Sequence, residues 1–161
     1  MNSLFSRAAL AGLLMGAAVV ASAADANTAL KSQEPPKDAK VFIVSPADGA
    51  TVDKTFTVKF GIEGMTLKPA GDQTPHTGHH HLLVDVDNEP VADQPLPTSL
   101  MPASGVALPA GPQVLHFGKA QTEATLTLTP GKHTLQLVLG DKFHVPFKPA
   151  VESKKITVEV K

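Results

Sequence analysis

The sequence TPHTGHHHLLVDVD, residues 74–87, contains three consecutive histidines followed directly by an apolar run that is typical of a β-strand. Side chains alternate between the two faces of a strand. The even-numbered Leu82, Val84 and Val86 are expected to line a hydrophobic core, and His80 is expected at its rim. The odd-numbered His79, His81 and Asp85 are then expected to project together from the opposite face.

Two residues on one face of a strand lie about 7 Å apart between their Cα atoms, so the imidazoles of His79 and His81 can converge on one metal ion. Neutral imidazole suits copper and zinc. His144 is the third expected ligand, and it lies in a segment that we expect to be a loop. His116, also expected in a loop, and Asp141 are the supporting residues, because histidine ligands are commonly oriented by a second polar group.

The same histidines are also compatible with a structural role, in which each ring is hydrogen-bonded to backbone. We expect that role for His80, which faces the core, and for His133, which shares the inward parity of Leu135. The alternative function is then a non-enzymatic module that binds an envelope component or a periplasmic protein. A hydrolase with a metal-activated water has little support, because no G-x-S-x-G, H-E-x-x-H or P-loop pattern occurs. No catalytic or organic-cofactor-binding residue is assigned.

Short alternating segments account for most of the remaining chain. The expected strands are Val41–Val44, Thr55–Ile62, Thr122–Leu128, His133–Leu139 and Lys155–Val160, in addition to the histidine strand. A Thr-Pro-Gly-Lys turn at residues 129–132 predicts that two of them form a hairpin. With no amphipathic helix, the pattern predicts an all-β fold, an antiparallel immunoglobulin-like sandwich of about seven strands over residues 41–161. Residues 88–113 contain six prolines and are expected to form an irregular insert loop.

The N-terminus has the features of a secretory signal peptide. Arg7 precedes the apolar run Ala8–Val20, and small residues follow at Ala21-Ser22-Ala23. We expect residues 1–24 to be a cleaved signal peptide and 25–40 a flexible leader, so that the mature protein is periplasmic. The apolar run is too short for a transmembrane helix, and none is expected in the mature chain.

Composition excludes several classes of site. The chain has no cysteine, which excludes disulfides and thiolate metal ligands. Its only arginine is Arg7, and the formal net charge is -1, so no basic surface for nucleic acid is expected. The expected partner is either a metal ion (copper or zinc) or another periplasmic protein.

Several segments together resemble a known family. They are Gly78–Asp85, His116–Glu123, Pro130–Asp141 and His144–Pro146, with the terminal strand. They resemble a bacterial exported family of histidine-rich domains, designated domain of unknown function 4399, over roughly residues 41–161. The resemblance implies a small periplasmic immunoglobulin-like domain and implies no activity. This chain departs from the family pattern at Phe147, where the family often has a second histidine, and in its longer insert at 88–113.

Overall fold

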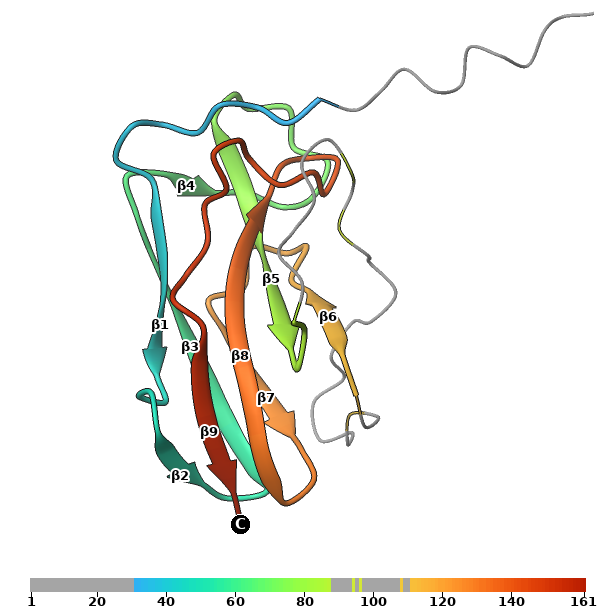
Figure 1. Ribbon diagram of the computed structural model, residues 1–161. Helices are drawn as coiled ribbons and strands as arrows, with labels where there is room; N and C mark the ends of the chain where they lie inside the picture. Colours follow the sequence, from blue (N-terminus) through green and yellow to red (C-terminus); the bar gives the residue numbers. More distant parts are fainter. Residues whose placement is uncertain (1–30, 88–93, 95, 97–107, 109–110) are drawn as a thin grey trace, which may run out of the picture.

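The computed structural model describes residues 31–87, 94, 96, 108 and 111–161, and within these residues the fold is all-β (Figure 1). The predicted signal peptide and most of the predicted insert lie outside the described residues. The described part has nine strands and no helix, so it contains no helix that could cross a membrane. The strands are β1 (Lys40–Ser45), β2 (Ala50–Val52), β3 (Thr55–Glu63), β4 (Thr66–Leu67), β5 (Thr77–Val84), β6 (Gln113–His116), β7 (Glu123–Thr127), β8 (Gly131–Gly140) and β9 (Ile156–Val160).

About seven strands were expected, and six were given by residue range. The structure adds three short strands outside those ranges: β2, β4 and β6. β2 and β4 pair parallel with β9 and β5, so the expected antiparallel pairing holds for most but not all of the strands. The strands form a three-stranded sheet, β1-β3-β7, and a six-stranded sheet, β2-β9-β8-β5-β4, in which β6 also pairs with β5. β8 and β9 lie in front of β3 and β7 in Figure 1.

The two sheets contribute to one hydrophobic core. Val58 and Leu126 enter it from the three-stranded sheet, and Leu82, Leu137 and Val158 from the six-stranded sheet, each with at most 1% of its surface exposed. Burying a side chain of this size contributes about 1.5–3 kcal/mol to stability. The alternation of apolar residues in the sequence therefore identifies the core-facing positions of both sheets.

The expected hairpin across residues 129–132 does not form. β7 pairs with β3, whereas β8 pairs with β5 and β9, so this turn carries the chain from one sheet to the other. Leu126 and Leu137 both face the core, as expected, but they approach it from opposite sides. Alternation predicts which face of a strand is buried, and it does not predict which strand is the neighbour.

The other face of the six-stranded sheet carries a second, smaller apolar cluster. Leu83 and Val138 of β5 and β8 pack there against Leu96, which belongs to the segment expected to be an insert. The backbone N–H of Leu96 donates to the His144 carbonyl at 2.8 Å. A residue of this segment therefore lies on the same face of β5 as His79 and His81.

Candidate metal centre

Strand β5 places its three histidines on two faces of the six-stranded sheet. It lies between β8 and β6, and all three imidazoles are fully buried. His80 faces the core, where its ring lies 5.1 Å from that of Phe60 and its Nδ1 donates to the Gln121 carbonyl at 3.0 Å. His79 and His81 lie on the opposite face, with ring centroids 4.8 Å apart. The alternation predicted for these three residues is confirmed.

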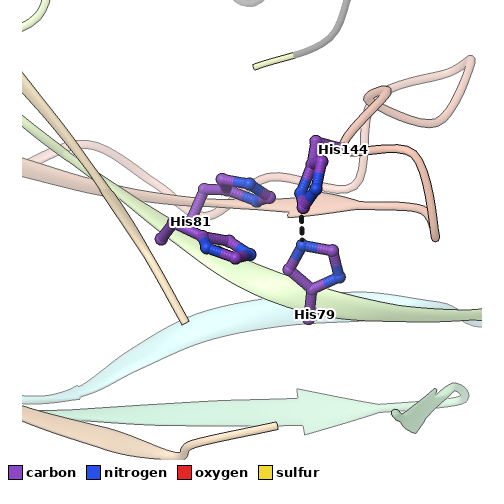
Figure 2. Close-up of side chains that lie close together, drawn as sticks. His79, His81 and His144 are labelled. Carbon is purple, nitrogen blue, oxygen red and sulfur yellow. Dashed lines mark hydrogen bonds between the residues drawn. The ribbon is translucent and has the colours of Figure 1, made fainter. Parts of the chain in front are cut away.

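Two further histidines join His79 and His81 on that face. One ring nitrogen from each of His79, His81, His116 and His144 can be chosen so that all four atoms lie within 4.8 Å of one another. The labelled rings of His79, His81 and His144 point toward one another in Figure 2. The shortest contact joins His79 Nε2 to His144 Nδ1 at 3.0 Å. We call these four residues the histidine cluster; the sequence analysis expected His79, His81 and His144 as ligands and His116 as a supporting residue.

His116 reaches the cluster through strand pairing. It is the last residue of β6 and not a loop residue as expected, and it is the direct cross-strand partner of His81. Directly opposite residues of an antiparallel pair have side chains on the same face. The two imidazoles consequently lie together, with centroids 5.2 Å apart.

His144 reaches the cluster through a tight turn after β8. Its backbone has a φ of 67°, a left-handed conformation that few non-glycine residues adopt. Asp141 organises this turn, because its Oδ1 accepts hydrogen bonds from the backbone N–H groups of Phe143 (2.8 Å) and Val145 (3.0 Å). Asp141 thus fixes the segment that presents the His144 ring.

Asp141 itself lies outside the group of four ring nitrogens. Its Oδ2 accepts a hydrogen bond from Gln33 Nε2 at 2.8 Å, so both carboxylate oxygens are occupied. Only 2% of the residue is exposed. Two ion pairs of the described residues are His133–Asp85 and Lys154–Asp48, and neither includes this carboxylate. The structure therefore places Asp141 as a buried carboxylate in the turn beside the cluster, without an ion-pair partner in the described part.

Two glycines give the rings their space, and the sequence analysis did not identify them. A Cβ atom at Gly140 would lie 2.7 Å from His81 Cε1, and one at Gly118 would collide with His116 Cε1. Gly140 is the cross-strand neighbour of His79, and Gly118 follows His116 by two residues. The available sequence signals were a glycine two residues after His116 and a glycine four residues before His144.

The cluster concentrates unsatisfied polar atoms. Six buried side-chain nitrogen or oxygen atoms of the described residues have no hydrogen-bond partner, and four of them are His79 Nδ1, both ring nitrogens of His81, and His116 Nε2. Each such atom costs about 1–3 kcal/mol relative to a satisfied one. These ring nitrogens therefore lack the partners that a structural role would supply.

Burial keeps the four rings neutral. It lowers the pKa of His79 to about 3, and the neighbouring His144 and His116 lower it further in the same direction. Burial also lowers the pKa values of His81, His116 and His144. Neutral imidazole is the form that binds metal ions, so binding at neutral pH requires no release of a proton to solvent. Only one ring of the hydrogen-bonded pair His79 and His144 has to move its proton to its other nitrogen.

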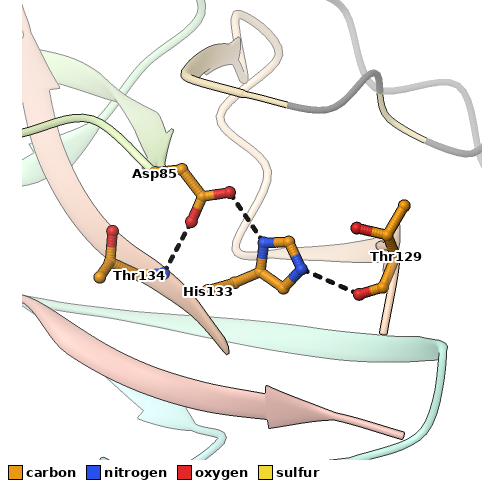
Figure 3. Close-up of polar contacts among 4 residues, drawn as sticks. All are labelled: Asp85, Thr129, His133 and Thr134. Atoms are coloured by element: carbon orange, nitrogen blue, oxygen red, sulfur yellow. Dashed lines mark hydrogen bonds and ion pairs between the residues drawn. The ribbon is translucent and has the colours of Figure 1, made fainter. Parts of the chain in front are cut away.

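In contrast to the cluster rings, His133 has a hydrogen-bond acceptor beside each of its ring nitrogens (Figure 3). Its Nδ1 lies 2.7 Å from Asp85 Oδ2, and its Nε2 lies 2.9 Å from the Thr129 carbonyl. Asp85 Oδ1 accepts from the backbone N–H of Thr134 at 2.9 Å. Since both ring nitrogens face acceptors, the geometry favours a ring that carries two protons. Burial alone would lower the pKa of His133, but the hydrogen bonds to Asp85 and Thr129 outweigh it and the pKa is raised.

Asp85 was expected to project with His79 and His81, and this expectation is wrong. β5 ends at Val84, and Asp85 has a left-handed φ of 56° that redirects its side chain toward β8. The same turn moves Val86 out of the shared core, where it was expected, to the second apolar cluster. The expected structural role of His133 agrees with its hydrogen bonds.

A comparison with known families gives one match. Residues 58–161 match the family described as "Domain of unknown function (DUF4399)". The match spans more than half of the chain, so the protein belongs to this family, as the resemblance of its histidine segments predicts. No similar protein was found among curated proteins or solved structures. All four cluster histidines and Asp141 lie within the matched residues.

Proposed function

We propose that this member of the DUF4399 family binds one transition-metal ion, copper or zinc, through His79, His81, His116 and His144. The observation that carries the proposal is the convergence of four neutral imidazoles whose buried nitrogens largely lack hydrogen-bond partners. Metal–nitrogen bonds of about 2.0–2.1 Å require ligand nitrogens about 3.4 Å apart in a tetrahedral site. The spread of 4.8 Å exceeds this by an amount that small ring rotations can close.

The alternative, an interaction module with structural histidines, requires rings that are individually bonded to backbone. His80 and His133 meet this requirement, through Gln121 and Thr129. Within the cluster, the His79 backbone lies close enough to the His81 ring to raise its pKa, but burial outweighs that contact. The one hydrogen bond described between cluster ring nitrogens joins two histidines, His79 and His144. The cluster therefore supports ligand binding over a purely structural role.

A metal-dependent hydrolase has less support than binding. Such an enzyme needs a substrate pocket that opens onto the metal. A hollow of about 130 Å³ lies nearby, lined by Gln33, Gln73, Thr74, Pro75, Thr77 and Lys142. None of the cluster histidines lines this hollow. Metal binding or handling is the function that we propose.

The proposal includes export of an immunoglobulin-like sandwich domain to the periplasm. Arg7, the apolar run Ala8–Val20 and the small residues that follow support a signal peptide ending near residue 24. The two sheets with a shared core support the sandwich. N-terminal sequencing of the protein from a periplasmic fraction should give a first residue between 24 and 27. Recovery of the protein only from the cytoplasmic fraction, with Met1 retained, would contradict export.

The metal site is tested by metal analysis and titration of protein produced without a polyhistidine tag. We expect wild type to bind one equivalent of copper or zinc and the His79→Ala/His81→Ala variant to bind none tightly. The matched control is His76→Ala, which removes an exposed histidine close in the sequence but outside the cluster. Equal, weak uptake by wild type and the double variant would overturn the proposed function.

A further inference from the structure

We infer that the histidine cluster selects a monovalent soft ion, Cu(I), over the divalent ions Cu(II) and Zn(II). This inference rests on the metal-binding function proposed above. It starts from the charge of the site. Its four ligands are neutral imidazoles, and none of them is a carboxylate or a thiolate. The charge of a bound ion is therefore not cancelled by its own ligands.

Asp141 provides one compensating charge. Its carboxylate is 2% exposed and has no ion-pair partner among the described residues. It belongs to the same turn as His144, whose backbone N–H donates to the Asp141 carbonyl at 2.9 Å. Lys142, the neighbouring cation, donates instead to Gln73 Oε1 at 2.7 Å on the exposed surface, where solvent screens it. Three hydrogen bonds satisfy the oxygens of this carboxylate, but no cation balances its charge, and an ion in the cluster would supply one.

The number of compensating charges decides which ion fits. The cost of transferring an ion from water into a buried site grows with the square of its charge. Its attraction to one carboxylate grows only linearly with that charge. A +1 ion with four neutral imidazoles and Asp141 forms an electroneutral group. A +2 ion would leave one uncompensated positive charge beside the buried rings of His79 and His81, with His116 and the partly exposed His144 on its other side.

The geometry of the cluster agrees with this choice. Zinc requires all of its ligands near 2.1 Å in a tetrahedral arrangement, whereas Cu(I) binds stably with two or three nitrogens. The ring nitrogens are unevenly spaced, because His79 Nε2 and His144 Nδ1 are hydrogen-bonded at 3.0 Å while other pairs in the group lie up to 4.8 Å apart. An ion that accepts fewer ligands needs less rearrangement of these packed rings. Imidazole is a suitable ligand for copper in general.

The test is a set of anaerobic competition titrations. Cu(I) is titrated against a chromophoric Cu(I) chelator, and Cu(II) and Zn(II) are each titrated against a chelator of known affinity. We expect Cu(I) to bind at least about 100-fold more tightly than either divalent ion, equivalent to about 2.8 kcal/mol. Tighter binding of Cu(II) or Zn(II) than of Cu(I) would overturn the inference and leave the proposed metal site standing. Failure to bind any of the three ions would overturn the proposed function itself.

Asp141→Asn tests the charge argument without removing the turn. The asparagine Oδ1 can still accept from Phe143 and Val145, and its amide can donate to Gln33 after that side chain flips. Because the attraction is linear in charge, the logarithm of the affinity should fall about twice as much for Zn(II) as for Cu(I). The matched control is Asp48→Asn, which removes a carboxylate paired with Lys154 on the surface. Equal effects of the two variants on both metals would overturn the role assigned to Asp141.

Discussion

The histidine cluster and the His133–Asp85 pair place the same side chain in two opposite environments. At His133 each ring nitrogen faces an acceptor, and the pKa is raised. In the cluster, most of the buried nitrogens have no partner, and the pKa values are lowered. A histidine whose two ring nitrogens are both hydrogen-bonded has a structural role. Buried imidazoles with free lone pairs that converge are poised for a ligand, and burial alone does not distinguish the two cases.

Acid should separate the two sites, because it affects several rings of the cluster at once. The folded-state pKa of His79 is about 3 and the ordinary value is 6.5, so between these values the unfolded chain binds a proton that the folded chain does not. Metal-free protein should therefore lose stability as the pH falls below 6.5, by about 2 kcal/mol at pH 5 from His79 alone, with the other lowered rings adding to this. Urea unfolding at pH 5 and pH 7 in a chelating buffer measures the loss. A His79→Ala/His81→Ala variant that shows the same loss would contradict this assignment.

Metal should stabilise the protein only through the cluster. An ion at 1,000 times its dissociation constant adds about 4.1 kcal/mol to the free energy of unfolding. We expect a rise in Tm of about 10–20 °C for wild type and none for His79→Ala/His81→Ala. His133→Gln should keep the full rise, since His133 lies outside the cluster. A loss of the rise in His133→Gln would remove the distinction between the two sites.

Gly140→Ala should damage the cluster without removing a ligand. The new methyl group would lie 2.7 Å from His81 Cε1, so the ring must move. Overpacking of this kind costs about 1–3 kcal/mol, and metal affinity should fall at least about tenfold. Isothermal titration and urea unfolding measure the two effects. Gly118→Ala is the parallel variant, because it displaces His116 instead. Unchanged affinity in both variants would show that these rings do not bind the ion.

Asp85→Asn should have the smallest effect, confined to the other site. It removes the charge that holds the His133 proton, at a cost of about 1–2 kcal/mol near pH 6. Because the pKa of His133 is raised in the folded state, its stabilisation is complete below pH 6.5 and is lost as the pH rises through the raised value. The difference between wild type and Asp85→Asn in urea unfolding should therefore shrink at pH 9. Metal affinity should stay unchanged, and a tenfold loss would contradict the separation.

Local periodicity predicted a definite part of this structure. It placed His79 and His81 on one face and His80 on the other, because the two-residue repeat of a strand depends only on the chain itself. It also identified core residues such as Leu82 and Leu137. It did not identify which strands pair with each other. The Thr-Pro-Gly-Lys turn joins two sheets, and nothing in the alternating pattern distinguishes that connection from a hairpin.

The assembly of the cluster depends on contacts that sequence spacing does not encode. His116 lies opposite His81 because β6 pairs with β5, and His144 is presented by a turn that the Asp141 side chain holds. The Asp85 side chain does not lie on the same face as His79 and His81, because Asp85 itself has a left-handed backbone conformation that ends the strand. The four histidines were therefore predictable as candidates, whereas their meeting point required the register of the sheet.

The two glycines beneath the rings turn this centre into a recognisable sequence pattern. It reads His79-x-His81, then His116-x-Gly118, then Gly140-x-x-x-His144, where x is any residue. A chain that keeps every histidine but carries a larger residue at either glycine would lack the room to build the same centre. A search for proteins with an equivalent centre should therefore require glycine at these two positions as strictly as it requires the four histidines.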